Sequence, residues 1–365
     1  MNPKPNIVNL PVYKPGKPID EVKKELGLEE VIKLASNENP YGASPSAKAA
    51  IIADLDNLFL YPDGSAADLT AALAGHLGVQ SENIIFGCGS DEIIALICRA
   101  FFLPGDETIM ADQTFSVYKS NADIEGAVTI EVPLADGTHD LDGMLARVTD
   151  KTKVIWICNP NNPTGTIVPH DALVKFLDAV PAGVMVVLDE AYFEYVTDAS
   201  YSDGIKLLEQ YPNLVVLRTF SKIYGLAALR IGYGVASPQI INLINKVREP
   251  FNTSRLAQAG ALAALADQDY VAECRRLNSE GIVQLQGEFR RLGLRSFPAN
   301  GNFIMVDVRK PAVEVFDALL RLGIIVRAGH RLYPNYIRVT VGSAEQNKAF
   351  ITALEQTLSE QEVRA

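Results

Sequence analysis

The sequence predicts an α/β protein with a large, mostly parallel seven-stranded sheet between layers of helices, followed by a smaller α/β domain. Short apolar runs alternate with helix-length segments from residue 83 onward. Strands that are apolar on both faces are typical of a parallel sheet covered on each side. The 365 residues allow about two domains. We expect an N-terminal arm over 1–35, a large domain over 36–240 and a small C-terminal domain with an interdomain helix over 241–365.

The N-terminal arm contains five prolines, which favour extended backbone, and then a short helical segment that ends at Gly27. Residues 32–45 form a predicted loop, because Ser, Asn, Pro and Gly cluster there. Helical patterns follow at 46–55 and 66–77, and Gly78 is a typical residue to end the second one.

The large sheet is predicted from seven apolar runs. They cover residues 83–87, 107–111, 127–134, 153–158, 184–189, 214–219 and 230–236. After Pro238 a long helical region leads to a smaller α/β pattern, which ends in a helix that begins at Ala344. Open α/β sheets bind ligands at the carboxyl ends of their strands, so polar residues at these ends are the site candidates.

Composition excludes several classes of protein. The chain has 33 Lys and Arg against 44 Asp and Glu, a net charge of -11, which disfavours nucleic acid and anionic membranes as partners. The four cysteines are scattered without a C-x-x-C pair or a nearby histidine cluster, so we expect no metal site and no disulfide framework. With no secretory signal and no transmembrane run, a cytoplasmic protein is expected.

A glycine-rich turn follows the strand that ends at Gly87. Gly89 permits a tight turn, and Ser90 begins a helix whose free N–H groups can bind a phosphate. A dinucleotide fingerprint would need a glycine where Glu92 stands, and no phosphate-binding P-loop occurs in the chain. Ser90 could also act only as a helix cap.

Two further strand ends carry an acid and an amide. Asp189 closes the run 184–189, and a carboxylate in apolar surroundings needs a cationic or hydrogen-bonding partner. Tyr192, three residues later, either packs in the core or takes part in the site. The loop CNPNNPTG (158–165) has two Asn-Pro bonds, where cis peptides can occur, and it either forms a common turn or directs Asn162 to a ligand.

A fourth strand end carries a lysine. Lys222 follows the run 214–219, with hydroxyl residues Thr219 and Ser221 before it and Arg230 after it. A phosphate cradle, an acid, an amide and a lysine form the set that pyridoxal 5'-phosphate requires. The acid keeps the pyridine nitrogen protonated, and the lysine forms the Schiff base and then moves protons as a general acid and base.

Several segments carry a resemblance that covers essentially the whole chain. They are KLASNENPYG, YPDG, GCGSDE, CNPNNPTG, DEAY, RTFSK, GLAALRIGY and IRVTVGS. The chain resembles the fold-type-I pyridoxal-phosphate-dependent aminotransferases, and within them those that act on histidinol phosphate. The resemblance implies an aspartate-aminotransferase-like fold. It also implies that Lys222 forms the Schiff base, that Asp189 pairs with the pyridinium nitrogen, and that Asn162 and Tyr192 bond the phenolic oxygen.

The resemblance assigns further cofactor contacts. The cofactor phosphate is expected to contact Ser90, Asp91, Thr219, Ser221 and Arg230. Phe115 would stack on the cofactor ring. Tyr61 would reach the cofactor phosphate of a neighbouring subunit, which implies a homodimer with shared active sites. Cys88 stands where relatives commonly have Asn, and we expect the phosphate still to bind because backbone amides hold it.

The resemblance also implies the substrates. Arg338 would hold the carboxylate of glutamate in one half-reaction and the phosphate of the other substrate in the second, as a guanidinium fork can. Arg327 and Tyr13 would help to bind that phosphate, Asn37 would line the pocket, and His330 is expected to be a loop residue rather than a catalytic base.

The implied reaction interconverts L-histidinol phosphate and 2-oxoglutarate with imidazole-acetol phosphate and L-glutamate, a transaminase step of histidine biosynthesis. An aromatic amino-acid aminotransferase and a threonine-phosphate decarboxylase share the cofactor set and remain alternatives. A cofactor-binding regulator would usually bring a basic DNA-binding segment, for which this acidic chain leaves no room.

Overall fold

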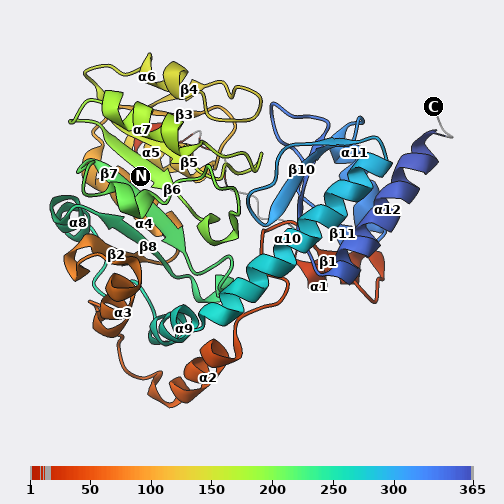
Figure 1. The fold of residues 1–365 in the computed structure, drawn as a ribbon, viewed down its shortest axis with the longest axis horizontal. Helices are drawn as coiled ribbons and strands as arrows, with labels where there is room; N and C mark the ends of the chain where they lie inside the picture. The colour runs from red at the N-terminus through yellow and green to blue at the C-terminus, as the bar shows by residue number, and fades with distance from the viewer. Residues whose placement is uncertain (1, 9, 11, 13–17, 363–365) are drawn as a thin grey trace.

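The computed structural model describes residues 2–8, 10, 12 and 18–362 (Figure 1). Tyr13, one of the predicted substrate residues, lies outside the described residues. In the part of the chain that is described, no helix combines the length and apolar character that a membrane crossing requires. Within the same part, no cluster of three or more His, Cys, Asp or Glu side chains is placed to hold a metal ion.

A seven-stranded sheet forms the centre of the large unit. In spatial order its strands are β2 (Ile84–Gly87), β8 (Gly232–Ala236), β7 (Leu214–Thr219), β6 (Met185–Asp189), β5 (Thr152–Cys158), β3 (Glu107–Ala111) and β4 (Val128–Val132). Strand β8 runs antiparallel to both of its neighbours, β2 and β7, and all other neighbouring strands of this sheet are parallel. The predicted fold class is therefore confirmed, and each strand coincides with one of the predicted runs.

The prediction that Arg230 opens the last of these strands is wrong. Arg230 has a left-handed backbone (φ 53°), and β8 begins two residues later, at Gly232. A strand residue cannot adopt this conformation. The turn removes the Arg230 side chain from the sheet, so that it lies beside the loop that follows β7.

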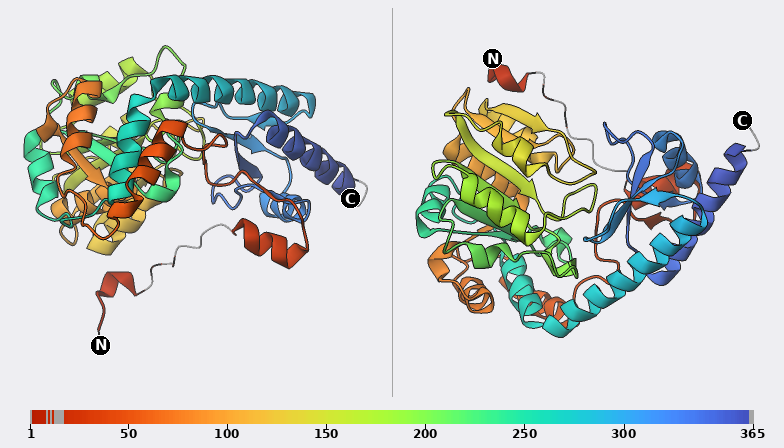
Figure 2. Two further views of the ribbon diagram at one scale, coloured as in Figure 1. Left: turned by 90° about the horizontal axis from the view of Figure 1, so that it is seen from below. Right: turned by 45° about the horizontal axis from the view of Figure 1, so that its top comes forward.

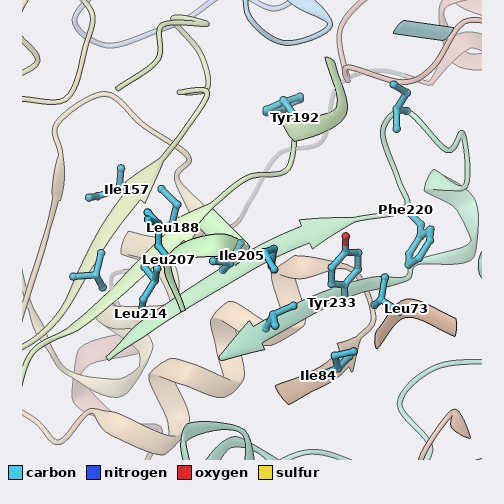
Figure 3. Close-up of a cluster of buried hydrophobic side chains, with 14 of the residues drawn as sticks. Leu73, Ile84, Ile157, Leu188, Tyr192, Ile205, Leu207, Leu214, Phe220 and Tyr233 are labelled. Atoms are coloured by element: carbon cyan, nitrogen blue, oxygen red, sulfur yellow. The ribbon is translucent and has the colours of Figure 1, made fainter. Parts of the chain in front are cut away.

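Alternate residues of the central strands pack into different hydrophobic cores. In β7, Leu214 and Val216 belong to one cluster while Val215 and Leu217 belong to another. Successive strand residues point to opposite faces, so the apolar runs are explained by a sheet that is buried on both sides. Figure 3 shows part of the first cluster, including Leu188 of β6 and Leu214 of the neighbouring strand β7.

Helices cover both faces of this sheet. The cluster around Val215 includes residues of α4 (Ser90–Phe101), α5 (Val117–Glu125) and α8 (Pro238–Asn245). The opposite cluster includes residues of α2 (Pro45–Ala53), α3 (Ala67–Leu77), α6 (Leu141–Leu145), α7 (His170–Ala179) and α9 (Arg255–Ala266).

A long helix leads to the C-terminal unit. Helix α10 (Gln268–Arg291) runs from beside α9 to a second sheet (Figure 1). That antiparallel sheet has the order β12 (Tyr336–Thr340), β10 (Phe303–Asp307) and β9 (Arg295–Ser296). Helices α11 (Ala312–Arg321) and α12 (Ala344–Glu362) pack with it around a third core.

The N-terminal segment connects the two units. Helix α1 (Ile19–Leu26) and strand β1 (Ile32–Lys33) lie with the C-terminal unit, where β1 pairs with β11 (Ile324–Ile325). The turn at Pro5–Ile7 lies instead beside the large unit (Figure 2), where the Asn6 amide donates to two carbonyls at the end of α5. After β1 the chain leaves the C-terminal unit, and residues 34–42 run between the two units.

Candidate active site

A cavity of about 660 Å³ lies at the carboxyl ends of the large sheet's parallel strands, facing the loop 327–331 of the C-terminal unit. Strands β2, β5, β6 and β7 each contribute residues at or just after their ends. The predicted residues that line it are Asn37, Ser90, Asp91, Phe115, Asn162, Asp189, Tyr192, Thr219, Ser221, Lys222, Arg230, Arg327 and Arg338. The rule about strand ends therefore located the cavity.

One end of the cavity has the chemistry of a phosphate cradle. Helix α4 begins at Ser90 after Gly89 (φ 80°), and no side chain caps its first turn. Arg230 donates to the Ser221 hydroxyl at 3.3 Å. A Cβ on Gly232 would lie 2.5 Å from the Ser90 nitrogen, so glycine is needed for β8 to approach this turn. Backbone N–H groups, a hydroxyl and a guanidinium thus converge on one place, as an anion requires.

Asp189 provides a buried carboxylate on the cavity floor. The Tyr118 hydroxyl donates to its Oδ2 at 2.6 Å, and the Ala191 backbone N–H donates to its Oδ1 at 3.1 Å. Burial raises the pKa of Asp189 to about 6, although both hydrogen bonds act in the opposite direction. Both donors are neutral, so a cationic group of a ligand would still be the natural partner of this carboxylate.

Lys222 provides a buried amine whose pKa lies below the usual value for lysine. Its Nζ lies 3.4 Å from the Ser36 carbonyl oxygen and 5.7 Å from the centre of the Tyr192 ring. Burial, and then the positive charge of Arg338, lower the pKa of Lys222 to about 8. A lysine with a pKa near neutrality has the free amine needed for nucleophilic or acid-base work.

A polar network joins the two units across the cavity. Tyr192 accepts hydrogen bonds from the side-chain amides of Asn37 at 2.9 Å and Asn162 at 3.4 Å. Arg338 donates to the Asn162 side-chain oxygen and to the Ala35 carbonyl, both at 2.6 Å. The predicted amide Asn162 thus fixes the orientation of both a tyrosine and an arginine.

Two arginines and a histidine form the wall opposite the sheet. The backbones of Arg327 and Arg338 are bridged by two hydrogen bonds of 3.0 and 2.8 Å. His330, expected to be a loop residue, does lie in a loop, and it also lines the cavity. Burial, and then the charges of Arg338 and Arg327, lower the pKa of His330 to about 4, so its imidazole is neutral at pH 7.

The family of the chain follows from a match over most of its length. Residues 29–354 match the model of the family described as aminotransferase class I and II. The chain belongs to this family. The matched range includes every residue that lines the cavity described above.

Within this family, the chain is similar over nearly its whole length to histidinol-phosphate aminotransferases. A histidinol-phosphate aminotransferase of Brevibacillus brevis is 55% identical over 360 residues, covering 98% of this chain and 99% of the relative. One from Bacillus subtilis is 50% identical, covering 98% and 100%. These relatives share both the length and about half of the residues of this chain.

Solved structures agree with the fold. The crystal structure of histidinol-phosphate aminotransferase from Sinorhizobium meliloti in complex with pyridoxal-5'-phosphate has a TM-score of 0.91 at 31% identity, covering 98% of this chain and 97% of that one. A mutant Thermus thermophilus aspartate aminotransferase has a TM-score of 0.83 at 21% identity, covering 98% and 99%. The expected aspartate-aminotransferase-like fold is confirmed.

Some predicted features of this aminotransferase lie elsewhere, and some contacts were missed. Tyr61 is outside the cavity, 79% exposed, and stacks on Phe251 with ring centres 4.8 Å apart. The peptide bonds before Pro160 and Pro163 are both cis, as considered from the sequence. Tyr118 was missed; the signal available was its position three residues after Phe115 at the start of a helix.

Proposed function

We propose that this aminotransferase uses pyridoxal 5'-phosphate to interconvert L-histidinol phosphate and 2-oxoglutarate with imidazole-acetol phosphate and L-glutamate. One observation carries the proposal: a single cavity joins a buried acid, a lysine of lowered pKa and two separate groups of anion-binding side chains. Relatives that are 50 to 55% identical over nearly their whole length bear the name of this activity.

The residues present fit the cofactor. The turn at Ser90, with Ser221 and Arg230, suits its phosphate, because free N–H groups and a guanidinium meet there. Asp189 would pair with the ring nitrogen, since this carboxylate has only neutral donors within the described chain. Lys222 would bind the cofactor aldehyde covalently. When bound, the cofactor supplies an electron sink that acidifies the substrate Cα–H bond.

Other side chains would hold the cofactor ring. Phe115 lines the cavity and offers an aromatic face for stacking. Asn162 and Tyr192 lie 3.4 Å apart and would bond the phenolic oxygen. Thr219 and Asp91 line the same end of the cavity as the phosphate cradle, where they would complete the phosphate contacts.

Lys222 would carry the proton transfer. Once the substrate amine has replaced its bond to the cofactor, the free Nζ would take the proton from the substrate Cα and later deliver it to the carbon of the cofactor's aldehyde group. A pKa near 8 suits both directions, because the amine and its conjugate acid are both populated near neutral pH. The Asp189 carboxylate would hold the proton on the ring nitrogen throughout.

Arg338 and Arg327 would bind the substrate anion. Arg338 is already oriented by Asn162 and Ala35, so its guanidinium loses little freedom on binding. Histidinol phosphate carries a phosphate and glutamate carries carboxylates, and a guanidinium fork accommodates either anion. Tyr13 and Asn37 remain proposed substrate contacts, the latter through its place in the cavity wall.

We also propose a homodimer. Large apolar side chains are exposed together on the surface around α2 and the loop after it. They are Ile52, Leu55, Leu58, Phe59, Leu60, Tyr61 and Phe251. Such a patch is typical of a protein interface. Tyr61 would then reach the cofactor phosphate of the second subunit. Phe59→Glu should shift the protein toward monomers in sedimentation experiments.

A cytoplasmic location and the division of the chain at residues 35 and 240 also remain proposals. The thiols of Cys88, Cys98, Cys158 and Cys274 are all free, which suits a reducing compartment. Separate hydrophobic cores in the large and C-terminal units support the division.

The test of the function follows each half-reaction through the visible absorption of the cofactor-loaded protein. Histidinol phosphate and glutamate should each convert the spectrum to the amine form, while phenylalanine and phosphothreonine should not. Conversion by phenylalanine but not by histidinol phosphate would overturn the substrate assignment. Arg338→Lys should slow both half-reactions, because it removes the fork; slowing of only one would contradict a shared anion site.

A further inference from the structure

Tyr118 touches two of the residues that would hold the cofactor ring. Its hydroxyl donates to Asp189 Oδ2 at 2.6 Å. Its ring meets the Phe115 ring edge-to-face, with centres 5.5 Å apart and planes at 81°. The Tyr118 side chain is fully buried. Neither the sequence nor the proposed reaction assigns a role to Tyr118.

We propose that Tyr118 is a positioning residue, whose hydroxyl fixes the orientation and the negative charge of the Asp189 carboxylate for a protonated ring nitrogen. The inference rests on the proposed function and goes beyond it, since it assigns the control of the Asp189 charge to a residue outside the predicted site. The alternative is that Tyr118 serves only as packing between α5 and the sheet.

The phenol is held rigidly. The Tyr118 ring stacks on Trp156, with centres 4.9 Å apart and planes at 10°. Trp156 donates from its indole nitrogen to the Thr108 hydroxyl at 2.8 Å, and Thr108 donates to the Val154 carbonyl at 2.9 Å. Because strands β3 and β5 fix this series of contacts, the hydroxyl of Tyr118 has little freedom to leave Asp189.

Two donors from different elements set the carboxylate plane of Asp189. The phenol from α5 occupies Oδ2, and the Ala191 N–H after β6 occupies Oδ1. Each carboxylate oxygen has two acceptor positions, so a further donor can still be accommodated on the cavity side. A ring nitrogen bearing a proton would be such a donor.

The hydrogen bond also acts on the charge of Asp189. Burial favours the neutral carboxyl, and the Tyr118 hydroxyl is the strongest influence that lowers the pKa of Asp189 again. Among the other titratable groups, Asp91 raises the pKa of this carboxyl and Lys222 lowers it. Burial and Asp189 keep the pKa of Tyr118 far above its usual value, so the phenol remains a donor.

The chain offers a matched control. Tyr211 is also buried, and its hydroxyl donates to Asp178 Oδ1 at the same distance of 2.6 Å. Neither residue lines the cavity. Tyr118→Phe and Tyr211→Phe therefore each remove a phenol–carboxylate hydrogen bond of the same length, one to the buried Asp189 beside the proposed cofactor site and one to the exposed Asp178 away from it.

The experiment measures the affinity of the protein without cofactor for two probes. These are pyridoxal 5'-phosphate and its 1-deaza analogue, in which a C–H group replaces the ring nitrogen. Tyr118→Phe should weaken binding of pyridoxal 5'-phosphate about tenfold, the scale of one hydrogen bond to a charged group, and leave binding of the analogue unchanged. Tyr211→Phe should leave the affinity for both probes unchanged.

Other outcomes would overturn the inference. Equal losses for both probes in Tyr118→Phe would show that the residue acts through packing, and no loss for either would show that its hydroxyl is irrelevant. In an Asp189→Asn background, Tyr118→Phe should no longer change the ratio of the two affinities, because the effect passes through that carboxylate. Failure of the wild-type protein to bind either probe would overturn the proposed function together with the inference.

Discussion

Asp189 and Glu190 are consecutive buried acids at the end of β6, and their surroundings differ completely. Asp189 faces the cavity and accepts hydrogen bonds from the neutral groups of Tyr118 and Ala191. Glu190 points to the other face of the sheet, where Arg218 donates to its Oε2 at 2.9 and 2.7 Å. Strand alternation thus separates two adjacent carboxylates into two environments.

The environment of Glu190 is closed. Arg218, its cationic partner, also donates to Asp203 at 2.6 Å and lies over the Phe193 ring at 3.4 Å. The Gly204 N–H donates to the other carboxylate oxygen of Glu190 at 2.9 Å. A buried acid whose cation belongs to the protein has no capacity left for a ligand, whereas Asp189 forms no ion pair with any described residue. An ion pair with a cation of the protein itself therefore distinguishes Glu190, a structural acid, from Asp189, a candidate catalytic acid.

The largest expected effects come from neutralising each acid in turn. Glu190→Gln should lower the free energy of unfolding by about 3 kcal/mol, the lower end of the cost of breaking a buried ion pair, because the charge of Arg218 then keeps only the partly exposed Asp203 as a carboxylate partner. Asp189→Asn should keep the stability of the wild type and lose about a thousandfold or more in turnover. Urea unfolding and steady-state kinetics on both variants measure the difference. Loss of stability in Asp189→Asn, or full activity in that variant, would erase the proposed distinction.

A smaller effect is the coupling between Glu190 and Arg218. Arg218→Met alone should destabilise the fold, because it leaves Glu190 buried and unpaired. The double variant Glu190→Gln with Arg218→Met should be more stable than the sum of the two single losses predicts, by about 1–3 kcal/mol. Urea midpoints of the four proteins complete the cycle. Strict additivity would mean that the 2.7 Å contact contributes nothing beyond each side chain alone.

The sequence predicted the parts of the fold and site that depend on local pattern. Apolar runs located every strand of the large sheet, and the rule about strand ends placed Asp189 and Lys222 in one cavity. The same local reasoning found the turn at Gly89 and the helix that begins at Ser90. These features need only residue type and position along the chain.

What the sequence left open depends on contacts between distant segments. Arg218 meets Glu190 only because β7 and β6 pair in one particular register. Tyr118 meets Asp189 because its side chain reaches from α5 to the end of β6, 71 residues away in the chain. The left-handed conformation of Arg230 could not be predicted from the sequence either, since arginine rarely adopts a positive φ. No local pattern specifies any of these three.

The smallest effect concerns a third acid near the same arginine. Glu194 is buried, and among the described residues Arg218 forms ion pairs with Glu190 and Asp203 rather than with it. Burial therefore raises the pKa of Glu194 to about 7, although the charge of Arg218 acts against this. Between the usual pKa of 4.5 and this value, the folded state holds a proton that the unfolded state releases. Stability should consequently fall as pH rises through this window.

Glu194→Gln replaces the ionisable carboxyl group with an amide that does not titrate. The variant tests whether Glu194 lacks an ion-pair partner of the kind that Arg218 provides for Glu190. At pH 8 the variant should be more stable than the wild type by about 1–2 kcal/mol, because the wild type must then bury a charge. Near pH 4.5 the two should be alike, since Glu194 is protonated in the folded wild type. Urea unfolding at both pH values measures the change. A variant that is less stable at pH 8 would show that the Glu194 carboxylate is ionised and paired, which would place it with Glu190.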